Sequence, residues 1–313
     1  MSTSCLDFED VRIPVPWGHI SGRWYGNRNV RPILALHGWQ DNLGTWTPLL
    51  PLLPKHISFL CIDFPGHGHS SRLPKGIIYN VIDYVLIVGR IMKVYKWEKV
   101  SLMGHSLGGI VAYTYASLLP DTVDLLIQID IIKTPYRSPD ETLKRYEIQA
   151  EKLLIADERY DDTKEPPVYT LEELEEVLHR GSGNSIDKDK CKYLIERGCA
   201  MSQRQPDKLY ISRDPKVKFY TEFVLHNSYI EDFAKRTTNI NHLVIRGTKS
   251  PYLKDSFELV DNMKKFNPNF RFYEVEGSHH IHLNKPDELA NIIGPFISDC
   301  RPENEIKETR SKL

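Results

Sequence analysis

Short apolar segments alternate with helical segments from residue 32 onward, and this alternation is the strongest constraint on the fold. Residues 32–38 (PILALHG) and 57–64 (ISFLCIDF) are apolar runs typical of buried strands. Between residues 81 and 95, apolar side chains recur every three or four positions, which predicts one face of a helix. Strands that alternate with helices predict βαβ units. We therefore expect an α/β fold with a mostly parallel central sheet flanked by helices.

The same alternation continues along the chain. Two segments near the N-terminus, VRIPV and HISGRWY, are typical of an antiparallel hairpin at the sheet edge. The further predicted elements are strands at residues 99–105, 123–130, 241–247 and 270–275 and helices at residues 107–119 and 286–297.

Residues 131–239 interrupt the alternation with a polar, helix-like stretch. Because this block falls between two consecutive strands, it should lie over the end of the sheet where the strand carboxyl ends gather, as a lid does. We predict an α/β core made by residues 1–130 and 240–299, an inserted helical lid at residues 131–239, and a solvated tail at residues 300–313.

Composition argues against several classes of protein. The formal net charge is −1, so no overall basic field would attract nucleic acid. No apolar segment approaches the length of a membrane span, and the first residues lack the charged and apolar regions of a secretory signal. The 5 cysteines are an odd number without C-x-x-C spacing, which indicates free thiols and no zinc site. We expect a soluble protein.

Ser106 stands between Gly104 and Gly108, where the predicted strand 99–105 meets the predicted helix 107–119. Glycine and serine also form ordinary turns. The spacing G-x-S-x-G between a strand and a helix, however, is typical of a nucleophile elbow, a tight turn that exposes the serine hydroxyl. We therefore predict that Ser106 is a nucleophile.

Serine is a weak nucleophile, so it needs a base and donors for the developing oxyanion. Residues 277–286 (GSHHIHLNKP) follow the last predicted strand and supply His279, His280 and His282. The loop 36–42 (LHGWQDN) follows an earlier strand, and its backbone can approach the serine. The three histidines could also bind a metal, but neighbouring residues of one short loop cannot all point inward, so we expect no metal and no cofactor.

The motifs HGW, DFPGHGHS, GHSLGG and GSHHIHLNKP, in this order, resemble the α/β-hydrolase superfamily from about residue 11 to residue 299. Within it, the chain is most similar to the serine hydrolase-like group that includes the insect kraken proteins. This resemblance implies the α/β-hydrolase fold with an inserted lid, and a serine hydrolase.

The resemblance also implies roles for particular residues. The family pattern after the last strand places the catalytic histidine at His279, because Asn284 takes the position of a common acid. His280 is the alternative. The backbone N–H groups of Trp39 and Leu107 would form the oxyanion hole.

The third member of the expected catalytic triad departs from the family pattern. Relatives commonly place an aspartate where this chain has Ser250, in RGTKSPY. Asp130 ends the strand after the elbow helix, a position that some relatives use for the acid. Asp255 is the rival on the usual loop. We predict the triad Ser106, His279 and Asp130.

Two functions follow from these residues. The first is a serine hydrolase that acts on an ester or thioester of a small-molecule acyl substrate, with lipid-derived acyl compounds as one class. The second is a non-catalytic binding protein that keeps the fold, which the loss of the usual acid at Ser250 would favour. No redox or nucleotide cofactor is implied.

The chain ends in Ser311, Lys312 and Leu313, the tripeptide by which an import receptor directs proteins to the peroxisome. The charged stretch before it should be solvated and accessible. We therefore expect a peroxisomal location and an import receptor as a partner, or a cytoplasmic location if the tripeptide is coincidental.

Overall fold

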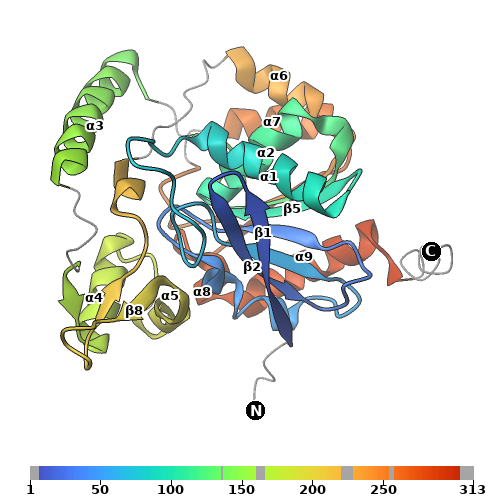
Figure 1. The fold of residues 1–313 in the computed structure, drawn as a ribbon. Helices are drawn as coiled ribbons and strands as arrows, with labels where there is room; N and C mark the ends of the chain where they lie inside the picture. The colour runs from blue at the N-terminus through green and yellow to red at the C-terminus, as the bar shows by residue number, and fades with distance from the viewer. Residues whose placement is uncertain (1–6, 135–136, 160–165, 220–227, 254–256, 304–313) are drawn as a thin grey trace.

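The computed structural model describes residues 7–134, 137–159, 166–219, 228–253 and 257–303. Among these residues, a mixed sheet of 8 strands forms the centre of the molecule, in the order β1, β2, β4, β3, β5, β6, β10, β11 (Figure 1). The strands are β1 (Phe8–Val15), β2 (Gly18–Tyr25), β3 (Ile33–Leu36), β4 (Phe59–Ile62), β5 (Val100–His105), β6 (Val123–Ile129), β10 (Asn241–Gly247) and β11 (Phe270–Val275).

The strands from β4 to β11 are parallel, whereas the hairpin of β1 and β2 joins the sheet antiparallel to β4. This arrangement agrees with the predicted edge hairpin and parallel sheet. Central strands such as β3 and β4 are buried along their whole length. Helices cover both faces of a parallel sheet, which is why these strands are continuous apolar runs in the sequence.

Alternate strand residues belong to two separate parts of the core. On one face, Leu34 and Leu36 pack in a cluster with residues of α1, α2 and α7. On the other face, Ile33 and Ala35 pack in a cluster with residues of α9 and of the short 3₁₀ helix η1. The flanking helices are α1 (Val81–Tyr95), α2 (Leu107–Leu118), α6 (Ser228–Arg236), α7 (Phe257–Phe266), α8 (Ile281–Asn284), α9 (Pro286–Cys300) and η1 (Leu43–Trp46).

The segment between β6 and β10 forms a separate lobe at one side of the sheet (Figure 1). It contains helices and also a small antiparallel sheet in the order β7, β9, β8, which the sequence analysis did not predict. Its last helix, α6, contacts α2 and α7 and so packs on the core. The other elements are α3 (Pro139–Arg159), β7 (Val168–Tyr169), α4 (Leu171–Gly181), α5 (Cys191–Gly198), β8 (Cys199–Met201), β9 (Leu209–Ile211) and the 3₁₀ helix η5 (Pro215–Phe219).

A buried ion pair joins this lobe to the core. Arg197 of α5 donates from Nε to Asp63 at 2.7 Å and from an Nη nitrogen to the Ser21 hydroxyl at 2.9 Å. Arg197 is 2% exposed and Asp63 is fully buried. Removing one partner of such a pair would leave the other charge buried and uncompensated, so the contact fixes α5 against the sheet.

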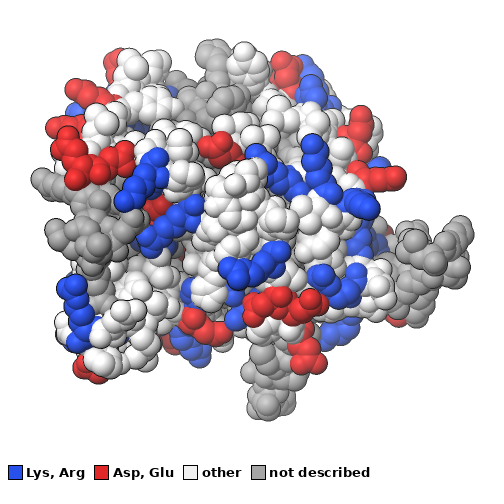
Figure 2. Space-filling model, viewed as in Figure 1, with Lys and Arg blue, Asp and Glu red and all other residues white. Residues whose placement is uncertain are grey.

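The surface carries charges of both signs. Basic and acidic side chains are interspersed over the face seen in Figure 2, consistent with the net charge of −1. Within the described residues, no helix is both long enough and apolar enough to cross a membrane.

Candidate active site

Ser106 lies between β5 and α2 in an uncommon backbone conformation. Its φ of 50° and ψ of −120° belong to a region that non-glycine residues rarely occupy. Its N–H donates to the Ile129 carbonyl at 3.3 Å, and its own carbonyl accepts from the Ile110 N–H at 3.0 Å. Strained residues held in this way are common at active sites. The strand, turn and helix that the motif requires are present, and the role of Ser106 as a nucleophile stays a prediction.

The glycines around Ser106 are required by close backbone contacts. A Cβ atom on Gly104 would overlap the backbone of Gly108 one turn later. A Cβ atom on Gly108 would overlap the carbonyl oxygen of Leu36 at the end of β3. Only glycine allows α2 to begin this close to two strands. The turn therefore holds Ser106 at the carboxyl end of the sheet, beside the loop that follows β3.

Asp130 and His279 form a buried hydrogen-bonded pair at the same end of the sheet. Asp130 follows β6, and His279 lies on the loop after β11. The Nδ1–H of His279 donates to Oδ2 of Asp130 at 2.6 Å, and the N–H of Gly247 donates to Oδ1 at 2.7 Å. Asp130 is fully buried and His279 is 7% exposed. The structure thus brings together the two residues that the sequence pairs, whereas their catalytic roles stay predictions.

Burial shifts the pKa values of this pair in opposite directions. It raises the pKa of Asp130 to about 7, although hydrogen bonding from Ser250 acts to lower it. It lowers the pKa of His279 well below the ordinary value for histidine. Each shift disfavours the charged form of its group. A neutral imidazole is the form that can accept a proton at Nε2.

Ser250, at the position where the resemblance predicts an acid, contacts Asp130, the acid that we predict in its place. Its side chain is fully buried and hydrogen-bonds Asp130, and its hydroxyl oxygen accepts from the Tyr252 N–H at 3.3 Å. Tyr252 lies against the candidate base, with its ring 4.3 Å from the ring of His279. The rival acid, Asp255, lies outside the described residues.

His105 connects Ser106 to the candidate base. It directly precedes Ser106, and its Nε2–H donates to the carbonyl of His279 at 3.0 Å. The two imidazole rings are 4.6 Å apart. Within the described part of the chain, no hydrogen bond joins Ser106 to His279 itself. Catalytic hydrogen bonds are often long or poorly aligned before substrate binds, so this does not argue against the pair.

The loop after β3 packs against the turn at Ser106. A Cβ atom on Gly38 would lie 2.9 Å from Nδ1 of His105, so this loop approaches the histidine closely. Trp39, the next residue, donates its indole N–H to the carbonyl of Val217 at 2.9 Å. The loop is therefore held close to His105, the residue before Ser106, and we predict that the Trp39 and Leu107 N–H groups form an oxyanion hole there. That role remains a prediction.

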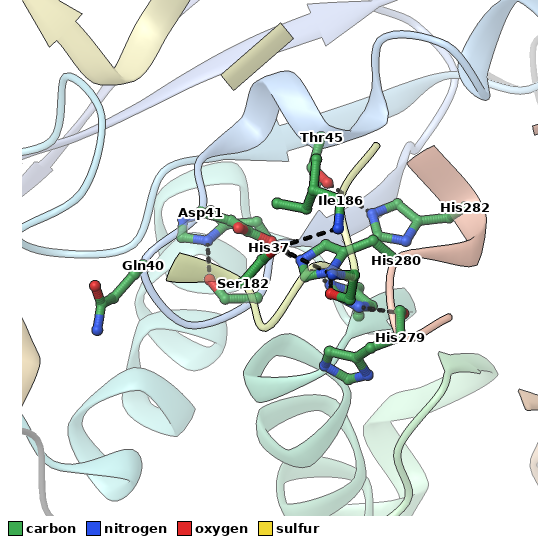
Figure 3. A network of polar contacts seen from close by, with 12 residues as sticks. His37, Gln40, Asp41, Thr45, Ser182, Ile186, His279, His280 and His282 are labelled. Atoms are coloured by element: carbon green, nitrogen blue, oxygen red, sulfur yellow. Dashed lines mark hydrogen bonds and ion pairs between the residues drawn. The ribbon is translucent and has the colours of Figure 1, made fainter. Parts of the chain in front are cut away.

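Sequence analysis did not single out a second buried acid, Asp41. Its Oδ2 atom lies 3.4 Å from Nε2 of His280 and 3.7 Å from Nδ1 of His105. Burial acts to raise the pKa of Asp41, but the two histidines hold it well below its ordinary value. His280 is therefore turned toward Asp41, in the network of Figure 3, and not toward Asp130. The aspartate in LHGWQDN was the available signal, since this loop was already expected at the site.

Three other histidines near the site bond to neighbouring groups. His37 accepts from the Phe64 N–H at 2.9 Å, and His67 accepts from the Gln40 N–H at 3.2 Å, so both histidines hold loop backbone. His282 is fully buried, with Nε2 2.7 Å from the Thr45 hydroxyl. Since only His279 contacts Asp130, neighbouring histidines of one loop indeed point to different partners.

Residues 31–286 match the model of a protein family that is described as having the alpha/beta hydrolase fold. The chain is 33% identical to a protein of Drosophila melanogaster named probable serine hydrolase, over 94% of this chain and 88% of that protein. It is 30% identical to the serine hydrolase-like protein of Mus musculus, over 92% and 95% of the two chains. The crystal structure of the hypothetical protein PA1622 from Pseudomonas aeruginosa PAO1 superposes with a TM-score of 0.79 at 26% identity, covering 93% of this chain and 99% of that chain.

The chain therefore belongs to the α/β-hydrolase family, and its relatives include proteins named serine hydrolase-like. This confirms the predicted fold class and the predicted resemblance. The fold and these relatives together support a hydrolase.

Proposed function

We propose that this protein is a serine hydrolase that cleaves a carboxylic ester or thioester through an acyl-enzyme. The observation that carries the proposal is the 2.6 Å hydrogen bond between Asp130 and His279, next to the strained turn at Ser106. A carboxylate on Nδ1 fixes the tautomer in which Nε2 is free to act as the base. The alternative binding protein would not need this pair.

In the proposed mechanism, the hydroxyl oxygen of Ser106 attacks the acyl carbon while Nε2 of His279 takes the hydroxyl proton. The backbone N–H groups of Trp39 and Leu107 donate to the oxyanion that forms. The bond to the leaving alcohol or thiol then breaks, and His279 returns the proton to it. Water, deprotonated by the same imidazole, then attacks the acyl carbon. The bond to the Ser106 oxygen breaks, His279 returns the proton to that oxygen, and the carboxylic acid is released. Asp130 stabilises the imidazolium in both steps.

A serine-directed fluorophosphonate probe tests the proposal. The wild-type protein should be labelled covalently, and Ser106→Ala should abolish the labelling. Ser117→Ala is a matched control, because it removes another hydroxyl from the same helix, α2. Turnover of a p-nitrophenyl ester should fall by about 10⁴-fold in Ser106→Ala. Absence of labelling in the folded wild-type protein would instead favour the non-catalytic binding protein.

The substrate class can be narrowed with a panel of acyl compounds. We propose a small-molecule acyl substrate, of which lipid-derived acyl compounds are one class, because the resemblance implies acyl transfer and the C-terminal tripeptide implies the peroxisome. p-Nitrophenyl esters of graded chain length, assayed beside acyl-CoA thioesters, separate the two chemistries. A preference for long acyl chains would support a lipid-derived substrate.

We also propose a peroxisomal location through Ser311, Lys312 and Leu313, which lie outside the described residues. A fluorescent protein fused ahead of residue 1 leaves the C-terminus free and should give peroxisomal puncta. Deletion of Leu313 should make the fluorescence diffuse. If the intact fusion is already diffuse, the tripeptide does not act as a signal and the protein is cytoplasmic.

A further inference from the structure

Three buried side chains from separate loops converge beside the candidate active site. They are Asp41 from the loop after β3, His105 from the end of β5 and His280 from the loop after β11. One ligating atom from each lies within 4.8 Å of the other two. All three residues are less than a tenth exposed. Imidazole nitrogens and a carboxylate oxygen are the ligands that zinc takes in proteins.

The distances suit a single ion. Oδ2 of Asp41 is 3.4 Å from Nε2 of His280 and 3.7 Å from Nδ1 of His105. Ligands of tetrahedral Zn²⁺ at about 2.0–2.1 Å from the metal are about 3.3 Å from one another. Small movements of the three side chains would therefore bring these atoms to bonding distance.

The hydrogen bonding of His105 leaves the lone pair of its Nδ1 atom directed at the Asp41 carboxylate. Its Nε2 faces the carbonyl oxygen of His279 at 3.0 Å, and a carbonyl only accepts, so Nε2 carries the hydrogen. In the neutral ring, Nδ1 then presents a lone pair to the carboxylate oxygen of Asp41, which also only accepts. Neither Nδ1 of His105 nor Oδ2 of Asp41 makes a hydrogen bond of ordinary geometry within the described residues, and both atoms are buried. Nε2 of His280 lies 3.4 Å from Oδ2, and the other nitrogen of that ring, Nδ1, contacts the Ser185 hydroxyl at 2.5 Å.

Two facing acceptors without a hydrogen between them are unfavourable in a buried site, unless a cation lies between them. The nearby Arg213 does not fill this position. Its guanidinium donates to Gln40, and no ion pair joins it to Asp41 in the part of the chain that the structure describes. On these grounds we propose that Asp41, His105 and His280 bind a divalent transition-metal ion of the zinc type. The inference goes beyond the hydrolase mechanism and does not depend on it.

Titration of the full-length, metal-free protein with Zn²⁺ tests the proposal by calorimetry. We expect one Zn²⁺ to bind per chain. Asp41→Asn and His280→Gln should each weaken this binding by at least about tenfold, because each removes a ligand. His242→Gln is the matched control: His242 is also fully buried and its Nδ1 also lacks a partner in the described structure, but it packs against Tyr113 and Phe270. It should bind Zn²⁺ as the wild type does.

Thermal unfolding provides a second readout. Zn²⁺ at about 100 times its wild-type Kd should raise the Tm of the wild type by about 5 °C, and that of the two ligand variants by about half as much or less. Circular dichroism without metal shows whether each variant is folded. Equal binding by the wild type and both folded variants, or no binding by the wild type, would overturn the proposal.

Anomalous diffraction from zinc-soaked crystals locates the ion without any substitution. The proposal requires a peak within bonding distance of all three ligand atoms. A peak only at cysteine thiols or at surface histidines would refute it.

Discussion

Asp130 and Asp41 are both buried and both lie against histidines of the loop after β11, but their carboxyl groups are satisfied differently. Asp130 accepts from the Gly247 N–H and from His279, so both of its oxygens have partners. Oδ2 of Asp41 lies between two imidazole nitrogens without a hydrogen bond in the described structure. The first arrangement fixes one ring in one orientation, whereas the second leaves room for a cation.

The pKa shifts of the two acids show what distinguishes them. Burial raises the pKa of Asp130 to about 7, yet the pKa of Asp41 is held well below its ordinary value despite burial. The histidines His280 and His105 act against burial at Asp41, whereas burial is the largest effect on the pKa of Asp130. Burial alone therefore does not set the pKa of a buried acid. The groups that contact the carboxyl oxygens of Asp130 and Asp41 also determine it.

The largest expected effect comes from Asp130→Asn. An amide in this position can hold the imidazole in the wrong tautomer and cannot stabilise the imidazolium, so kcat/KM should fall by about 10³- to 10⁴-fold. The measurement is hydrolysis of a p-nitrophenyl ester found in the substrate panel. Asp124→Asn is the matched control, because Asp124 lies at the opposite end of β6 and pairs with Arg31. Nearly full activity in Asp130→Asn would contradict the proposal that Asp130 is the acid that supports His279.

The pH dependence of the wild-type enzyme tests the same pair. Activity requires His279 neutral and Asp130 ionised, so gain of one proton by the pair inactivates the enzyme. With the Asp130 pKa at about 7, kcat/KM should rise with pH and level off above that value. Two pH units below the midpoint it should be about 100-fold lower than on the plateau. A profile with no acid limb would show that the pair does not limit catalysis.

A smaller effect separates the two neighbouring histidines. His279→Gln should reduce kcat/KM about as much as Asp130→Asn does, because both changes disable the base. His280→Gln, assayed with a metal chelator present, should reduce it by less than about tenfold, because His280 faces Asp41. The reverse order would make His280 the base and Asp41 its acid.

Most of the fold could be predicted because each element has a local signal. The strands β3 and β4 are unbroken apolar runs, and the three- and four-residue spacing of apolar side chains over 81–95 matches α1 (Val81–Tyr95). The small sheet of β7, β8 and β9 has strands of only 2 or 3 residues, too short to show any periodicity. Its pairing depends on contacts within the inserted lobe, which sequence alone does not specify.

The candidate site was only partly predictable for the same reason. Asp130 could be proposed because it ends a strand, and parallel strands end at one edge of the sheet. The loop that carries Asp41 was expected at the site, but its partners could not be predicted, because His105 at the end of β5 and His280 after β11 meet it only when the sheet and the two loops fold together. Ser250 was interpreted as a lost acid, whereas its contact with Asp130 is visible only in the structure.

The smallest expected effect is that of Ser250→Ala. Hydrogen bonding from Ser250 lowers the pKa of Asp130, so its loss should raise that pKa and move the acid limb of the pH profile to higher pH. A hydrogen bond of ordinary strength corresponds to a shift of about half to one pH unit. The plateau rate should change little, since His279 keeps its bond to Asp130. Thr248→Ala, on the same loop but exposed, should leave the midpoint unchanged.

The direction in which Ser250→Ala moves the midpoint of the acid limb shows which groups stabilise the Asp130 carboxylate. If Ser250 only fills space, the midpoint stays in place and Asp130 depends on His279 and Gly247 alone. If Ser250 supports the carboxylate, the midpoint rises while Asp130→Asn still abolishes the plateau, which separates the acid from the group that tunes it. A shift to lower pH would mean that the hydroxyl accepts a hydrogen bond from a protonated Asp130. In that case Ser250 would raise the pKa of Asp130 and favour its neutral form, so Ser250 would oppose the carboxylate instead of supporting it.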